Sequence, residues 1–217
     1  MSSNIINLLW ESFLETILMV GVSGGLGAAI GIPLGVFLFV TSPKGIMPKP
    51  YVNRIIGTVV NAVRSTPFII LLVAIIPFTR LIVGSSISTV AAIVPLTIAA
   101  APLIARLVET SLREVDKGLI EAAQSMGATN TQIICKVLIP EAMPGILAGL
   151  TIAFVALVGS SAMAGAVGGG GLGDMGIRYG YQRFMPEVMA AVVIILIVFV
   201  QSLQSFGDWM VRRVSHR

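Results

Sequence analysis

Residues 188–200 read VMAAVVIILIVFV and contain no charged or hydrogen-bonding side chain. The apolar run extends to about residues 187–208. It can cross the hydrocarbon core of a bilayer, because a helix needs about 20 residues to do so. A strand edge would find no hydrogen-bond partner in lipid, so this segment is predicted to be a helix. The stretch therefore indicates a membrane-spanning protein.

The composition of the whole chain also favours a lipid environment. Of 217 residues, 56% are hydrophobic and 11% are charged, whereas soluble domains average about 25% charged residues. The net charge is +4. The basic residues lie at the ends of apolar runs, so we expect membrane lipid as a partner and no nucleic acid. Cys135 and His216 are the only residues of their kinds, so we predict no disulfide framework and no metal.

Four more apolar stretches have the length of a membrane span. The predicted fold is an all-α integral membrane protein with five transmembrane helices in a single transmembrane domain, residues 1–217. The first stretch is predicted to be a true span rather than a signal peptide, because residues 1–15 contain no Lys or Arg. The predicted spans cover about residues 16–40, 56–78, 84–107, 145–166 and 187–208.

The first span carries glycines at four-residue intervals, at 21 and 25 and again at 27, 31 and 35. This spacing allows a neighbouring helix to approach closely. The pattern leaves open whether the neighbour belongs to the same subunit or to a second copy, and we favour the same subunit.

The distribution of Lys and Arg predicts the orientation. Most of them lie in the 41–54 connection, in residues 106–144 and in the C-terminal tail, whereas Arg80, Arg178 and Arg183 lie on the opposite side. Because cytoplasmic loops are rich in basic residues, we expect the N-terminus outside and the C-terminus in the cytoplasm. Arg64 falls inside the second span, and we expect it to reach the cytoplasmic interface or to face protein.

A small, polar segment interrupts the apolar chain at residues 119–134, LIEAAQSMGATNTQII. Asp116 can cap a helix from Lys117 to Met126, and Gly127 follows at the position that favours a left-handed backbone. One stripe with helical spacing combines bulky and small apolar side chains, which suits a groove on a partner protein. Its residues are Leu119, Ala122, Ala123 and Met126.

A second short helix is predicted directly after this one. Thr129 and Gln132 have the spacing of a capping box, and Pro140 is expected to end the helix QIICKVLI. The result is a cytoplasmic helical hairpin between the third and fourth spans.

These residues carry a family resemblance. Glu121-Ala122-Ala123, Gly127 and the run Val137–Pro140 resemble the EAA loop of bacterial ABC importer permeases, with Val137 for Ile and Ile139 for Leu as departures. The resemblance implies a coupling helix that docks on a separate ATP-hydrolysing subunit. The implied contact residues are Glu121, Ala122, Ala123, Met126, Gly127 and Ala128. The sequence contains no phosphate-binding G-x-x-x-x-G-K-[ST] motif, so ATP and Mg²⁺ are expected on that partner and no cofactor on this chain.

Two further stretches, VRSTPFIILLVAIIPFTRLIVG and GGGGLGDMGIRYGYQRF, resemble permeases of methionine importers. The second stretch contains G-x-G-x-x-G, but no predicted strand precedes it, so we do not expect a dinucleotide site. We expect residues 167–186 to form a flexible external loop. On the family analogy, Asp174, Arg178 and Arg183 would contact a periplasmic or lipid-anchored substrate-binding protein.

Small residues surround one bulky side chain near the end of the fourth span, GSSAMAGAVGGGG. Met163 could close a pore on a symmetry axis, and Ser160 and Ser161 could supply hydroxyl groups to the pathway. Ordinary helix packing would also explain the small residues.

The resulting hypothesis is a permease subunit of an ATP-driven methionine importer in the bacterial inner membrane. It would act by alternating access, as a homodimer with two cytoplasmic ATP-binding subunits, and would not itself be an enzyme. One alternative is a permease for another small amino acid. Another is a membrane scaffold or enzyme, for which Asp208, His216 and the basic tail are the only candidate polar cluster.

Overall fold

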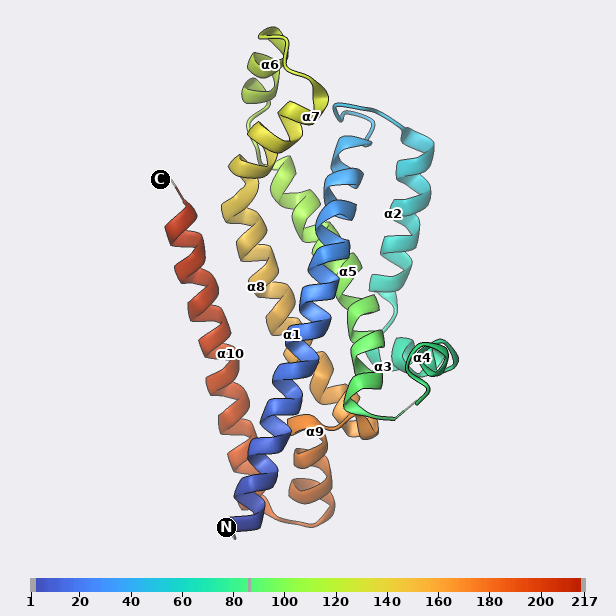
Figure 1. Cartoon of the computed structure of the whole chain (residues 1–217), viewed down its shortest axis with the longest axis vertical. Coiled ribbons are helices and arrows are strands. Elements are labelled where there is room, and N and C mark those ends of the chain that lie inside the picture. Colours follow the sequence, from blue (N-terminus) through green and yellow to red (C-terminus); the bar gives the residue numbers. More distant parts are fainter. Residues whose placement is uncertain (1–2, 86, 216–217) are drawn as a thin grey trace.

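The computed structural model describes residues 3–85 and 87–215, and within these ranges it contains helices and no strand (Figure 1). Three π-helical segments, named η1 to η3, continue neighbouring helices. In chain order the elements are α1 Ser3–Val40, α2 Pro50–Ser65, α3 Phe68–Ala74, α4 Ile76–Val83, α5 Thr89–Arg113, α6 Lys117–Ser125, α7 Asn130–Ile133, η1 Ile134–Leu138, α8 Ile139–Ala164, η2 Gly165–Gly169, α9 Gly171–Met175, η3 Gly176–Gln182 and α10 Pro186–Val214.

The long helices lie side by side along the long axis of the molecule (Figure 1). Four helical runs are long and apolar enough to cross a membrane, and a fifth is obtained if the bent pair α2 and α3 counts as one span. Helices α6 and α7 lie at one end, beside the connection from α1 to α2, and α9 lies at the other end near the N-terminus (Figure 1). The all-α membrane fold predicted from the sequence is confirmed.

Helices α1 and α5 form the centre of the packing. A Cβ atom added to Gly31 would lie 2.7 Å from the carbonyl oxygen of Ala101, and one added to Gly35 would lie 2.5 Å from that of Ala105. These glycines therefore let two backbones approach more closely than any side chain would permit. The preference for a close contact within the subunit is confirmed at these two positions. Helix α1 also begins at Ser3, well before the predicted residue 16.

The second span is not the single helix predicted for residues 56–78. Helices α2 and α3 meet at an angle of 105°, and α4 follows directly. The break lies at Thr66 and Pro67, where Thr66 adopts an extended backbone with ψ 124°. Proline disfavours the helical conformation in the residue before it, which explains the bend. Arg64 lies exposed in the last turn of α2, next to this break.

Pro140 does not end a helix, contrary to the prediction. The helix continues through Pro140 from Asn130 to Ala166, before the non-helical backbone of Val167 and Gly168, and the π-helical turn Ile134–Leu138 ends two residues before the proline. A proline ring collides with the carbonyl group four residues earlier in a regular α-helix. Here that residue is Lys136, which lies inside the wider π-helical turn, so the helix continues.

Candidate functional site

The helix of the EAA-like segment is capped at both ends by its own residues. The Asp116 carboxylate accepts a hydrogen bond from the Gly118 N–H at 2.8 Å. At the other end Gly127 has φ 79°, and the Gly127 and Ala128 N–H groups donate to the carbonyl groups of Gln124 and Ala123. This pair of bonds satisfies carbonyl groups that the end of a helix leaves free. The predicted caps are confirmed, and the helix ends at Ser125 with Met126 as its cap.

The small apolar stripe of α6 divides between two faces. Ala123 is 4% exposed and packs in the main core cluster, with Ile120 and Ala128 against it. Leu119, Ala122 and Met126 are exposed, Met126 by 81%. The prediction that all four stripe residues face a partner is therefore wrong for Ala123, because α6 must bury one side to stay attached to the bundle. Glu121 and Gly127 are exposed beside the outward face.

The second half of the hairpin begins with the predicted capping box. The Thr129 hydroxyl accepts from the Gln132 N–H at 3.4 Å, and the Gln132 side chain accepts from the Thr129 N–H at 2.9 Å. Ile133 and Leu138 are fully buried in the same cluster as Ala123. The hairpin is thus joined rigidly to the start of α8.

The small-residue segment at the end of α8 places its three candidate pathway residues differently. Met163 is 50% exposed, whereas Ser161 is 1% exposed and its hydroxyl donates to the Val158 carbonyl at 2.8 Å. The Ser161 hydroxyl is buried and donates within its own helix, so in this structure it does not reach an exposed pathway surface as predicted. Ser160 is partly exposed, and its hydroxyl contacts the Ala156 carbonyl at 3.2 Å.

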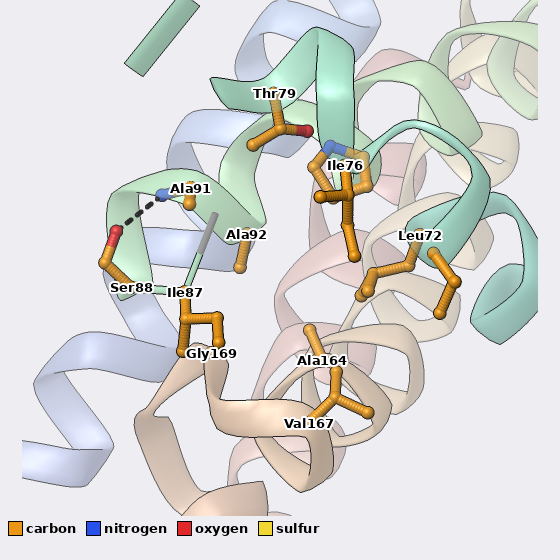
Figure 2. Close-up of a pocket in the computed structure, with 12 residues that line it drawn as sticks. Leu72, Ile76, Thr79, Ile87, Ser88, Ala91, Ala92, Ala164, Val167 and Gly169 are labelled. Carbon is orange, nitrogen blue, oxygen red and sulfur yellow. Dashed lines mark hydrogen bonds between the residues drawn. The ribbon is translucent and has the colours of Figure 1, made fainter. Parts of the chain in front are cut away.

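A cavity of about 110 Å³ lies next to this segment. Figure 2 shows Ala164 and Val167 on one side of it, with Leu72 of α3, Ile76 of α4 and Ala92 of α5 around the rest. Thr79 is 3% exposed and lines the same cavity. The cavity is therefore a small, mainly apolar space among α3, α4 and α5, and it is also lined by Ala164, the residue after Met163.

The region predicted as a flexible loop, residues 167–186, is a packed helical hairpin. The Gly171 N–H donates to the Glu15 carboxylate at 2.6 Å, and the Leu172 N–H donates to the Thr16 hydroxyl at 2.9 Å. Leu172 and Met175 are buried in a second core cluster. Helix α1 thus supplies the caps for the first turn of α9. Because these caps come from α1, more than 150 residues earlier in the chain, local composition could not reveal them.

The charged residues of this hairpin make their contacts within the hairpin. Arg178 pairs with Asp174 at 2.9 Å, and the Arg183 guanidinium lies 4.4 Å from the ring centre of Tyr179. Both arginines remain exposed. The three residues named from the sequence are therefore neighbours in one short segment, although Asp174 already has a partner within the chain.

Sequence reasoning missed a buried charge cluster at the end of α5. Glu109 is 4% exposed and accepts from Arg106 at 2.6 Å and from Arg113 at 2.5 Å. Arg106 also donates to the Gly57 carbonyl of α2 at 3.1 Å. The available signal was Glu109 three residues after Arg106 and four before Arg113, because this spacing brings the side chains together on a helix.

Comparisons with known proteins agree with this architecture. Residues 31–216 match the family described as Binding-protein-dependent transport system inner membrane component. The chain is 57% identical over 211 residues to the probable D-methionine transport system permease protein MetI of Vibrio cholerae, covering 97% of this chain and 94% of that one. It is 45% identical to the methionine import system permease protein MetP of Bacillus subtilis, with coverage of 96% and 94%.

The whole chain also resembles solved structures. One of them is described as an inward facing conformation of the MetNI methionine ABC transporter, and it matches with a TM-score of 0.97, 51% identity and complete coverage of both chains. An amino acid ABC transporter with histidines matches with a TM-score of 0.79 at 21% identity and shares the fold. From the family match and the near-complete relatives, the chain belongs to the inner membrane components of binding-protein-dependent transport systems.

Proposed function

We propose that the chain is the membrane-spanning subunit of an ATP-driven importer of methionine. One observation carries this proposal: the likeness to methionine permeases extends over almost the entire chain, at 57% identity in sequence and a TM-score of 0.97 in structure. A shared transport fold alone would not require such agreement in the loops. The likeness to an inward-facing structure further supports an inward-facing conformation for this chain.

The outward face of α6 is the proposed contact with the ATP-hydrolysing subunit. Its Ala122 leaves room for a close approach, and Met126 projects from the end of the helix with 81% of its surface exposed. Two copies of the chain would bind two such subunits, which hold ATP and Mg²⁺. The excess of basic residues on the side of α6 supports an orientation with α6 inside the cell and the N-terminus outside.

The external hairpin is the proposed contact with a substrate-binding protein. Arg178 and Arg183 are its exposed cations, and the Glu15 and Thr16 caps hold the hairpin in place. Met163, on its exposed face of α8, would close the route on the axis between two copies, with Ser160 near it. Closure of the ATPases would move α6 and the helices joined to it, so that the route opens outward.

Uptake into cells that cannot make methionine tests the substrate. The chain, its ATPase and its binding protein would be expressed together, and accumulation of labelled methionine would be measured with and without a hundredfold excess of other amino acids. We expect unlabelled methionine to suppress uptake and the other amino acids to leave it unchanged. Preferential suppression by a different amino acid would contradict the methionine assignment and keep the importer assignment.

Docking is tested at Ala122 rather than at the buried Ala123, where a large side chain would disturb the fold itself. Ala122→Trp should prevent co-purification of the ATPase and abolish uptake, while Ala122→Ser, which keeps the small size, should preserve both. The permease content of the membrane should be equal in the two variants. Normal transport by Ala122→Trp would contradict the docking role of α6.

A further inference from the structure

A groove of about 660 Å³ lies between the α1–α2 connection and helix α6. Phe39 and Ile46 contribute apolar surface from one side, and Val115 and Ile120 contribute it from the other. None of the exposed stripe residues Leu119, Ala122 and Met126 lines this groove, although Glu121 beside them does.

The charges of the groove are mainly positive. Lys44, Arg113 and Lys117 line it, against one acidic residue, Glu121. Arg113 pairs with Glu109, yet 61% of its side chain remains exposed. A ligand with a negative charge and an apolar part would therefore find complementary surface for both.

One wall of the groove is preformed by a tight turn. The Gly45 N–H donates to the Ser42 carbonyl at 2.9 Å, and the Met47 N–H donates to the Val40 carbonyl at 3.0 Å. The Asn53 side chain of α2 donates a hydrogen bond to the Leu38 carbonyl at 2.6 Å, which links α2 to the end of α1 beside this turn. A ligand would not have to order this segment, which lowers the entropic cost of binding.

The groove lies at the ends of two spans. Helix α1 ends at Val40 and α5 ends at Arg113, so the lining residues begin in the last turns of α1 and α5. This is the level of the polar headgroups beyond the hydrocarbon core. Basic pockets between spans on the cytoplasmic side are typical sites for anionic lipid headgroups.

We propose that this groove binds the headgroup of an anionic phospholipid, with the upper part of an acyl chain against Phe39 and Ile46. The inference rests on the proposed function only for the cytoplasmic orientation of α6. Binding would connect the α1–α2 turn to the base of the coupling helix.

Native mass spectrometry of the purified full-length permease in detergent tests the site. Dioleoyl phosphatidylglycerol is titrated against dioleoyl phosphatidylcholine, and inorganic phosphate is added in a separate series. We expect the permease to retain phosphatidylglycerol more tightly than phosphatidylcholine. The affinity for phosphatidylglycerol should fall about fivefold in Lys44→Ala or Lys117→Ala and about thirtyfold in the double variant, because each Lys near the headgroup contributes about 1 kcal/mol of binding free energy. Lys49→Ala is the matched control, because Lys49 is exposed in the same connection and does not line the groove.

Each remaining outcome would overturn the proposal in a distinct way. Equal loss of lipid in Lys49→Ala would reduce the effect to general surface charge. Displacement of phosphatidylglycerol by millimolar phosphate would assign the groove to a soluble anion. One-for-one displacement by the added ATPase would assign it to an acidic protein segment. Because these readouts need no transport, failure of methionine uptake would count against the proposed function and not against the lipid site.

Discussion

Removal of the Glu109 carboxylate should destabilise the protein more than any other single loss of charge near the membrane interface. Glu109 is 4% exposed and binds two guanidinium groups. In Glu109→Ala, Arg106 keeps its hydrogen bond to the Gly57 carbonyl but loses its counter-charge. Its Nε atom, which is buried and without a partner among the described residues, makes the site still less favourable.

The magnitude follows from the exposure of the two arginines. Removing one partner of a fully buried ion pair costs about 3–5 kcal/mol, whereas exposed pairs contribute about 0–1 kcal/mol. The Arg106 side chain is 24% exposed and that of Arg113 is 61% exposed. Arg106 therefore accounts for most of the effect, and we expect a loss of about 3 kcal/mol from Glu109→Ala.

The assay is thermal unfolding of the purified permease in detergent, followed by the loss of monodisperse protein on size-exclusion chromatography. Glu109→Ala should lower the midpoint clearly, whereas the double variant Arg106→Met, Glu109→Met should recover most of the loss, because an apolar pair leaves no buried charge unpaired. Asp174→Ala serves as the control, since its partner Arg178 is 54% exposed and we expect little change. If Glu109→Ala unfolds at the temperature of the Asp174 control, the reasoning about this cluster is refuted.

Three further predictions concern glycines and the gate. Gly35→Ala should destabilise the protein by about 1–3 kcal/mol by overpacking, since its Cβ would lie 2.5 Å from the Ala105 carbonyl oxygen, while Gly21→Ala, with nothing within 4 Å, should be neutral in the same unfolding assay. Gly127→Val should lower the free energy of unfolding by about 1–2 kcal/mol. The cost comes from the left-handed backbone alone, because no atom lies within 4 Å of a Cβ there. Co-purification of the ATPase should fall in Gly127→Val and be retained in Gly127→Asn. Met163→Cys should crosslink to its twin under oxidation, because disulfides need Cα atoms within about 7 Å, and absence of a crosslink in every nucleotide state would contradict the gate.

Local patterns predicted the helix ends of the EAA-like segment well. Asp116, Gly127 and the Thr129 capping box act within a few residues of themselves, so the sequence contains all the partners that these caps require. The glycine spacing of the first span was equally informative, because a residue without a side chain has few reasons to recur every four positions.

Patterns failed where partners come from distant parts of the chain. Residues 167–186 are rich in glycine and resemble a loop, yet Glu15 and Thr16 cap their first helical turn from α1. Pro67 and Pro140 are the same residue type with opposite outcomes. The first follows an extended residue and bends the chain by 105°, whereas the second follows a π-helical turn and leaves the helix continuous. Local composition does not distinguish these two cases.

The continuity at Pro140 has a mechanical consequence for the proposed transport cycle. The helix that begins at Asn130 continues to Ala166, before the non-helical backbone of Val167 and Gly168, and at about 1.5 Å per residue it extends for roughly 55 Å. It begins beside α6, where Ile133 packs in the same cluster as Ala123, and it contains Met163 near its far end.

A break at Pro140 would have let α6 move without α8. Because the helix is unbroken at Pro140, a tilt that an ATPase imposes on the α6–α7 hairpin would be transmitted along one rigid helix to the small-residue segment at the end of α8. The close glycine packing of α1 on α5 and the α1 caps of α9 then join the external hairpin to the same body, so that coupling loop, gate and external surface are expected to move together.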